Sequence, residues 1–210
     1  MGIPVLILGE SGSGKSTALR NFAPEEVGIF NVAGKPLPFR KKLKKVDYAG
    51  YDTIRKSLAK PRLKTYVIDD SQYLMAFEEL DRARESGYTK FTEMALNFSG
   101  LVRSIITDLP EDVIVYFLHH TEVTDTGRIK AKTVGKMIDS KLTLEGLFAI
   151  VLLCEADSSG HHFVTQSDGF TTAKSPMDMF PAQIDNDLKL VDDTIRAYYW
   201  GDDNKEKETE

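Results

Sequence analysis

The chain has 210 residues, of which 41% are hydrophobic and 28% are charged, and its formal net charge is −5 at pH 7. This length is enough for one α/β domain with a buried core, and the composition is ordinary for a globular protein. The negative net charge excludes a general attraction to nucleic acid, so any such binding must use local basic patches.

The sequence also indicates where the protein acts. It has no apolar run of the roughly 20 residues that a membrane helix needs, so we expect no membrane partner. Residues 1–4 lack the basic region of a signal peptide and lead directly into a predicted strand. The single cysteine, Cys154, excludes an internal disulfide and fits a reducing compartment. We therefore expect a cytoplasmic protein.

The first predicted strand covers residues 3–8, and a predicted helix runs from Ser16 to Phe22, before Pro24. Between them, residues 9–16 read Gly-Glu-Ser-Gly-Ser-Gly-Lys-Ser. This is the G-x-x-x-x-G-K-S pattern of the P-loop, or Walker A motif. The predicted strand, loop and helix follow one another in the order that the motif requires. A glycine-rich turn that matched the pattern by chance would not need a strand before it and a helix after it.

Each residue type in this loop has a reason in the chemistry of a triphosphate. Glycines let successive backbone N–H groups face the phosphate oxygens, and the start of the helix adds partial positive charge. We expect Lys15 to reach the β- and γ-phosphates and the Ser16 hydroxyl to ligate Mg²⁺. The predicted cofactors are therefore ATP and Mg²⁺. The predicted nucleotide-binding residues are Gly9, Glu10, Ser11, Gly12, Ser13, Gly14, Lys15, Ser16 and Thr17.

A second strand is predicted over residues 27–32, and a short helix over residues 51–59. The segment between them includes a basic run, residues 35–45, with six lysines and arginines and no acid. Glycine and proline residues at the start of that run end the second strand.

The next predicted strand, residues 65–70, ends in two aspartates and is a Walker B candidate. The carboxyl ends of parallel strands meet at one edge of a sheet, so these acids should face the same crevice as the P-loop. We expect Asp69 to hold Mg²⁺. Asp70 either orients the attacking water or acts as a general base, or else it caps the helix that starts at Ser71.

Apolar residues at helical spacing predict helices over residues 72–85 and 91–109, followed by a strand over residues 113–118. His119 and His120 close that strand. Adjacent residues of a strand point to opposite sides, so at most one of them faces the nucleotide. His120 is our candidate sensor of the γ-phosphate and His119 the second; the alternative is a histidine that only caps the strand end.

The polar segment 121–136 has two glycines and reads as a long mobile loop beside the nucleotide site. Its basic side chains could contact phosphates of single-stranded DNA, or the segment could be a solvated surface loop. The candidate nucleic-acid-binding residues are Arg128, Lys130, Lys132 and Lys136.

The last part of the chain predicts a strand over residues 149–153 and then a hairpin of residues 160–166 and 170–174. Its turn is the Ser-Asp-Gly sequence between them. A final helix is predicted over residues 184–200. We expect residues 1–200 to form one ATPase domain, and residues 201–210 to be an acidic, disordered tail.

These motifs together resemble the RecA-like P-loop ATPase core, in particular the phage-encoded RecA-core single-strand-annealing (Sak-type) proteins. The resemblance covers residues 3–200 and is strongest at residues 9–17 and 67–70. It implies an α/β fold with a mainly parallel central sheet flanked by helices and a C-terminal antiparallel hairpin. It also implies a ring or filament with ATP at subunit interfaces, in which Lys174 reaches the γ-phosphate of the neighbouring subunit, and single-stranded DNA bound by segment 121–136.

The sequence departs from that family in two places. RecA carries a catalytic glutamate just after the second strand, whereas residues 31–34 of this chain contain no acid. Either Asp70 takes over that role or hydrolysis is slow. In addition, no oligomerisation segment precedes the first strand in the sequence given, so we do not expect filament formation through an added N-terminal element.

Three functions follow from these features. The first is a DNA-dependent ATPase of homologous recombination or single-strand annealing, in the host cytoplasm if the gene is phage-encoded. The second is an ATP-dependent loader or accessory protein that binds a replication helicase, a single-strand-binding protein or another replication protein. The third is a small-molecule kinase, for which Arg82 and Arg84 are the only material for an arginine lid.

Overall fold

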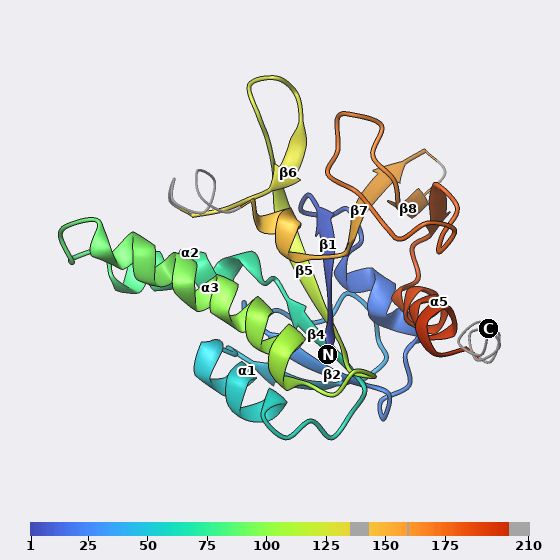
Figure 1. Ribbon diagram of the computed structural model, residues 1–210, viewed down its shortest axis with the longest axis horizontal. Coiled ribbons are helices and arrows are strands. Elements are labelled where there is room, and N and C mark those ends of the chain that lie inside the picture. Colours follow the sequence, from blue (N-terminus) through green and yellow to red (C-terminus); the bar gives the residue numbers. More distant parts are fainter. Residues whose placement is uncertain (135–142, 159, 202–210) are drawn as a thin grey trace, which may run out of the picture.

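A computed structural model describes residues 1–134, 143–158 and 160–201. These residues form a mixed α/β fold around a nine-stranded sheet of order β3-β2-β4-β5-β1-β7-β8-β9, with β6 paired to β5 (Figure 1). The strands are β1 (Ile3–Gly9), β2 (Val27–Asn31), β3 (Lys44–Asp47), β4 (Thr65–Asp69), β5 (Ile114–Val123), β6 (Ile129–Ala131), β7 (Ile150–Asp157), β8 (Gly160–Val164) and β9 (Gln183–Asp185).

The helices lie in two layers, one on each face of the sheet. They are α1 (Tyr51–Leu58), α2 (Gln72–Asp81), α3 (Thr89–Asp108) and α5 (Leu188–Trp200), with short 3₁₀ helices η1 (Ser16–Asn21) and η2 (Leu144–Leu147). None of the helices in the described part of the chain is long and apolar enough to cross a membrane.

Alternation along the central strand β1 explains the two layers. Leu6 and Leu8 belong to a buried cluster with α1, α2 and α3, while Val5 and Ile7 belong to a second cluster with η1 and α5. Successive side chains of a strand point to opposite faces, so a strand that is apolar throughout is buried on both. The strands β2, β3, β4, β5, β1 and β7 pair in parallel, as such a doubly covered sheet requires.

The expected α/β class and mainly parallel sheet are therefore confirmed, but two predicted elements are wrong. Segment 121–136 is not one long loop, because β5 continues to Val123 and turns back as β6. The predicted final helix starts only at Leu188, because Ile184 lies in β9. Asp187 caps α5 by accepting hydrogen bonds from the backbone N–H groups of residues 189 and 190, which fixes the later start.

The predicted C-terminal hairpin is also wrong in its partners. The antiparallel hairpin joins β7 to β8, and β9 then pairs with the outer side of β8. Residues 170–174 form no strand; among them only Lys174 forms a bridge, to Val151 of β7. The Asp-Gly turn does form, because Asp168 accepts a hydrogen bond from the N–H of Phe170, but it connects irregular segments.

Candidate functional site

The loop from Gly9 to Ser16 joins the carboxyl end of β1 to η1. Gly12 and Gly14 adopt left-handed backbone angles, with φ of +84° and +101°. Lys15, which follows, is in the right-handed helical region. A left-handed residue followed by a right-handed one gathers backbone N–H groups into a concavity that suits an anion. These backbone angles are compatible with the predicted phosphate-binding loop.

Gly14 cannot be replaced without strain. A Cβ at this position would lie 2.9 Å from the ring of His161, in addition to the unfavourable φ. We expect Gly14→Ala to lower the free energy of unfolding by about 1–3 kcal/mol. Thermal or urea unfolding measures this, with Gly50→Ala as the matched control, because Gly50 has a negative φ and open space around its Cα. Equal stability of the two variants would contradict the prediction.

Three side chains from the C-terminal third of the chain form hydrogen bonds with backbone carbonyl groups of this loop. Cys154 Sγ donates to the carbonyl oxygen of Ser13 at 3.0 Å, and His161 Nδ1 lies 2.8 Å from the same oxygen. Asn186 Nδ2 donates to the carbonyl oxygen of Gly14 at 3.3 Å. Burial raises the pKa of Cys154 to about 11, so the thiol keeps the proton that it donates. The carbonyl groups of Ser13 and Gly14 are thus occupied by donors from the C-terminal part of the chain.

Lys15 is buried and folded over the loop. Its Nζ donates to the carbonyl oxygens of Gly9 at 2.7 Å and Glu10 at 2.8 Å. An ammonium group has three hydrogens, so these two bonds leave one donor for a further oxygen. Burial lowers the pKa of Lys15, because removing water disfavours the charged form, while Asp69 and Asp70 oppose this effect.

Asp69 lies at the carboxyl end of β4 and accepts a hydrogen bond of 2.8 Å from the Ser16 hydroxyl. Burial raises the pKa of Asp69 to about 6, although the bond from Ser16 lowers it. A hydroxyl and a carboxylate are the hard oxygen ligands that Mg²⁺ prefers. Among the described residues no group of three or more His, Cys, Asp or Glu could hold a metal ion. Mg²⁺ held by these two side chains would therefore take its other ligands from water and phosphate, as it commonly does.

Asp70 adopts a left-handed φ of +59°, and its carboxylate is bonded on both oxygens. Lys35 Nζ donates to Oδ2 at 2.9 Å, and His120 Nε2 lies 3.2 Å from Oδ1. Burial raises the pKa of Asp70, but the hydrogen bonds from His120 and Lys35 outweigh burial, so the net pKa is lowered. The alternative that Asp70 caps α2 is wrong, because Ser71 occupies the N-cap position.

The two histidines point to opposite sides, as expected. His120 pairs with Gly9 in the β1–β5 ladder, and its side chain reaches Asp70. His119 is fully buried, with Nδ1 2.9 Å from the Ser71 hydroxyl and Nε2 2.8 Å from the carbonyl oxygen of Lys132. Burial lowers the pKa of His119 to about 4, so it stays neutral at pH 7. His119 is therefore enclosed within the protein, whereas His120 lines the cavity described next.

These side chains surround a cavity of about 240 Å³ at the carboxyl ends of β1, β4 and β5. Of the predicted residues, Ser11, Gly12, Gly14, Lys15, Ser16, Thr17, Asp69, Asp70 and His120 line it. Gly9, Glu10 and Ser13 belong to the same loop but do not line this cavity. Lys174 is not in the cavity either, because its main chain bridges to Val151 nearer the middle of the sheet. A role of Lys174 toward its own chain's cavity therefore has no geometric support.

Three of the predicted nucleic-acid-binding residues, Arg128, Lys130 and Lys132, lie on or next to the β5–β6 hairpin. Arg128 is exposed at its turn, and Lys130 forms a 2.8 Å ion pair with Glu122 of the opposite strand. The main-chain N–H of Lys132 donates to the carbonyl oxygen of His120. Lys136 lies outside the described residues. The hairpin carries acids among its bases, so its positive charge is weaker than the lysines and arginines alone suggest.

Several residues of the site were missed by sequence reasoning. Lys35 follows β2, and since the carboxyl ends of parallel strands share an edge, a lysine there was a usable signal. His161 and Asn186 gave no such signal, because their contacts with the loop join residues 148 and 172 positions apart.

A scan against models of known protein families finds no match, and a search of curated proteins finds no similar sequence. The function is accordingly inferred from the residues of the site.

Proposed function

We propose that this chain binds Mg-ATP in the cavity at the carboxyl ends of β1, β4 and β5 and hydrolyses it slowly. One observation carries the proposal: the Ser16 hydroxyl and the Asp69 carboxylate meet at 2.8 Å, although they are 53 residues apart. That pairing puts two magnesium-type ligands directly beside a loop whose backbone suits phosphate and whose lysine has a spare donor.

In this proposal the residues divide the work as follows. Backbone N–H groups of residues 9–17 bind the phosphate oxygens, and Lys15 gives its third hydrogen to a β- or γ-phosphate. Ser16 and Asp69 hold Mg²⁺, directly or through water, and the ion neutralises charge on the phosphates. Asp70 and His120 orient the attacking water. The lowered pKa of Asp70 makes it a weak proton acceptor, so it positions water better than it deprotonates it, and turnover is slow.

The wider proposal is a RecA-like, DNA-dependent ATPase of recombination or single-strand annealing that assembles with ATP at subunit interfaces. It is supported by the parallel sheet and by the β5–β6 hairpin, which carries Arg128 and Lys130 and continues the strand whose His120 lines the cavity. Thr121 and Ile129 of that hairpin line a second cavity, of about 720 Å³, together with Ser11 and Gly12 of the loop. A movement of the loop on hydrolysis would thus change the cavity that the hairpin also lines.

A second candidate, an ATP-dependent loader of a replication protein, is favoured by Asn31. Asn31 is the last residue of β2 and pairs with Asp69 of β4. In the RecA family the catalytic glutamate follows this strand. The Asn31 amide instead donates to the carbonyl oxygen of Lys35 and to the carboxylate of Asp47. Asn31 itself has no carboxylate to activate water. The kinase alternative is weakened, because Arg82 is engaged in ion pairs with Glu78, Glu85 and Glu93 rather than free for a lid.

The deciding experiment measures ATP turnover by phosphate release, with and without single-stranded DNA, at saturating Mg²⁺. We expect slow basal turnover that single-stranded DNA accelerates. Turnover that ignores DNA, together with capture of a replication helicase, would support the loader instead. Phosphate transfer to a nucleoside or metabolite would support a kinase. No binding of ATP at all would overturn the proposal.

We expect Lys174→Ala to leave ATP affinity unchanged but to lower turnover by about 10–1,000-fold, because a cation supplied to a neighbouring subunit acts only on the transition state. Turnover against protein concentration checks this, since a trans effect appears only in the assembled state. Lys64→Ala, which removes a lysine paired with Asp112 at the opposite end of the sheet, is the control. A Lys174→Ala variant with normal turnover would remove Lys174 from the mechanism.

A further inference from the structure

The positive charge of this acidic protein is concentrated in one segment. Residues 35–64 contain eleven lysines and arginines and two aspartates, although the whole chain has 27 basic and 32 acidic side chains. The remaining 180 residues therefore hold 16 basic and 30 acidic side chains. Such a separation of charge within one domain creates a local positive field that the net charge of −5 conceals.

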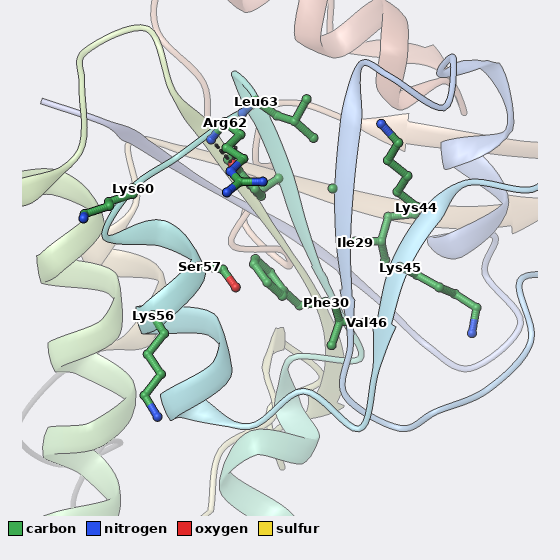
Figure 2. A pocket seen from close by; sticks show the side chains of 12 residues that line it. Ile29, Phe30, Lys44, Lys45, Val46, Lys56, Ser57, Lys60, Arg62 and Leu63 are labelled. Atoms are coloured by element: carbon green, nitrogen blue, oxygen red, sulfur yellow. Dashed lines mark hydrogen bonds between the residues drawn. The ribbon is translucent and has the colours of Figure 1, made fainter.

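The fold brings part of this segment together around a groove of about 550 Å³ (Figure 2). Its basic side chains come from three elements: the edge strand β3, the helix α1 and the loop before β4. They are Lys44, Lys45, Lys56, Lys60 and Arg62, and no acid lines the groove. A cavity of this size lies within the range of about 300–1,000 Å³ that is common for ligand sites.

Most of these cations have no acid to neutralise them. Lys45 pairs with Asp47, but Lys44, Lys56, Lys60 and Arg62 form no ion pair with any residue in the described ranges. Lysines on an edge strand discourage strand pairing, and lysines late in a helix favour its dipole, so the lysines taken one at a time have ordinary explanations. Neither reason applies to Arg62, and neither explains why all of them border one groove.

The floor of the groove is apolar. Figure 2 shows the Phe30 ring between α1 and the strands, with Val46 beside it and the lysine side chains extending outward at the rim. The Phe30 ring stacks on Tyr66 with centroids 5.9 Å apart, and both rings are buried, so Val46, at 46% exposed, is the main apolar surface that the floor offers. A rim of cations over an apolar floor suits a strand whose phosphates contact the cations and whose bases face the floor, as in single-stranded nucleic acid. A duplex hides its bases, and an acidic peptide has no need of such a floor.

The groove is separate from the candidate nucleotide cavity. Its residues Gly28, Arg62 and Tyr66 lie near the amino ends of β2 and β4, whereas the cavity lies at the carboxyl ends of these strands. No residue lines both. Lys35, which bonds to Asp70, begins the same basic segment.

We propose that this groove binds the sugar–phosphate backbone and bases of single-stranded nucleic acid. The proposal rests on the nucleic-acid part of the proposed function but not on ATP binding. It assigns the main phosphate contacts to residues 44–62 rather than to the β5–β6 hairpin, where Lys130 is already paired with Glu122.

The test is fluorescence anisotropy with a labelled oligothymidylate over a series of salt concentrations, with and without Mg-ATP. The groove variant is Lys56→Gln with Arg62→Gln, and a second pair is Lys44→Gln with Lys60→Gln. The matched control, Arg84→Gln with Arg103→Gln, removes the same charge from exposed positions outside the groove. We expect each groove pair to weaken binding roughly tenfold at low salt and to reduce the slope of log K against log salt by about 1.4. The control pair keeps the wild-type affinity and slope.

Three outcomes would overturn the proposal: wild-type binding by both groove pairs, loss of binding only in Arg128→Gln with Lys132→Gln, or equal competition by polyglutamate, which would indicate an acidic protein. ATP affinity, measured in the same variants with a fluorescent ATP analogue, separates this result from the proposed function. Intact ATP binding with unaltered oligonucleotide binding removes the groove and leaves the nucleotide site standing. Thermal melting of each variant verifies that it is folded.

Discussion

Replacing Lys15 with alanine is expected to reduce ATP affinity by roughly 10- to 160-fold. A hydrogen bond to a charged group is worth about 1.5–3 kcal/mol, and Lys15 is the cation that the cavity offers to the phosphates from within the loop. Its amine is held by the carbonyl oxygens of Gly9 and Glu10, so it is already in place before any ligand arrives. Little ordering cost is therefore left to offset the new bond.

Isothermal titration calorimetry or a fluorescent ATP analogue measures this loss. Lys64→Ala is the matched control, because it removes one lysine from the amino end of β4 and leaves the cavity intact. Far-ultraviolet circular dichroism verifies that the Lys15→Ala protein is folded. Unchanged affinity in a folded Lys15→Ala protein would refute the assignment of the loop to a triphosphate.

Asp69→Asn is expected to have opposite effects on turnover and on stability. Loss of the carboxylate removes a Mg²⁺ partner and should lower Mg-dependent turnover by about 10–100-fold. The same change should stabilise the free protein. Burial raises the pKa of Asp69 to about 6, so the folded state binds this proton more tightly than the unfolded state does. As pH rises from about 4 to 6, the ionised carboxylate lowers the free energy of unfolding, and above pH 6 the whole penalty, up to about 3 kcal/mol, is present.

Asparagine avoids this penalty and can still accept the hydrogen bond from Ser16. We therefore expect the melting temperature of Asp69→Asn to exceed that of the wild type by several degrees at pH 7 and by much less at pH 4, in the absence of metal. Asp112→Asn, which changes a partly exposed aspartate at the other end of the sheet, should show no such stabilisation. A destabilised Asp69→Asn protein, or one with normal Mg-dependent turnover, would show that Asp69 does not have the proposed role.

Local patterns predicted much of the fold, because runs such as residues 3–8 and 65–70 are apolar enough to be strands in almost any context. The errors arose where the pairing of distant strands decided whether a segment became a strand. The Asp168-Gly169 turn is real, yet residues 170–174 make no strand, because β9 takes the outer side of β8. Likewise β5 continues past His120 because β6 supplies a partner for its last residues. Neither partner is visible in a short window of sequence.

The contacts of the candidate site also divide into those that local motifs predicted and those that depended on the fold. Motif spacing predicted the pairing of Ser16 with Asp69, since both follow buried strands whose ends share an edge. The bond between Lys35 and Asp70 depended on the path of the chain after β2. The contacts of Cys154, His161 and Asn186 with the loop depended on long-range topology that no spacing rule provides. The basic run of residues 35–45 was visible, but its convergence with α1 and Arg62 needed the fold.

The contacts of His161 and Asn186 with the loop of residues 9–16 have a consequence for folding during synthesis. Ribosomes release chains from the amino end, so residues 9–16 emerge before His161 and Asn186. Strand β1 also waits for both neighbours, β5 and β7, before it is enclosed. A nascent chain interrupted before residue 186 would thus expose a loop that cannot yet retain a ligand. Under the proposed function, ATP would then bind only after residue 186 has emerged and folded against the loop.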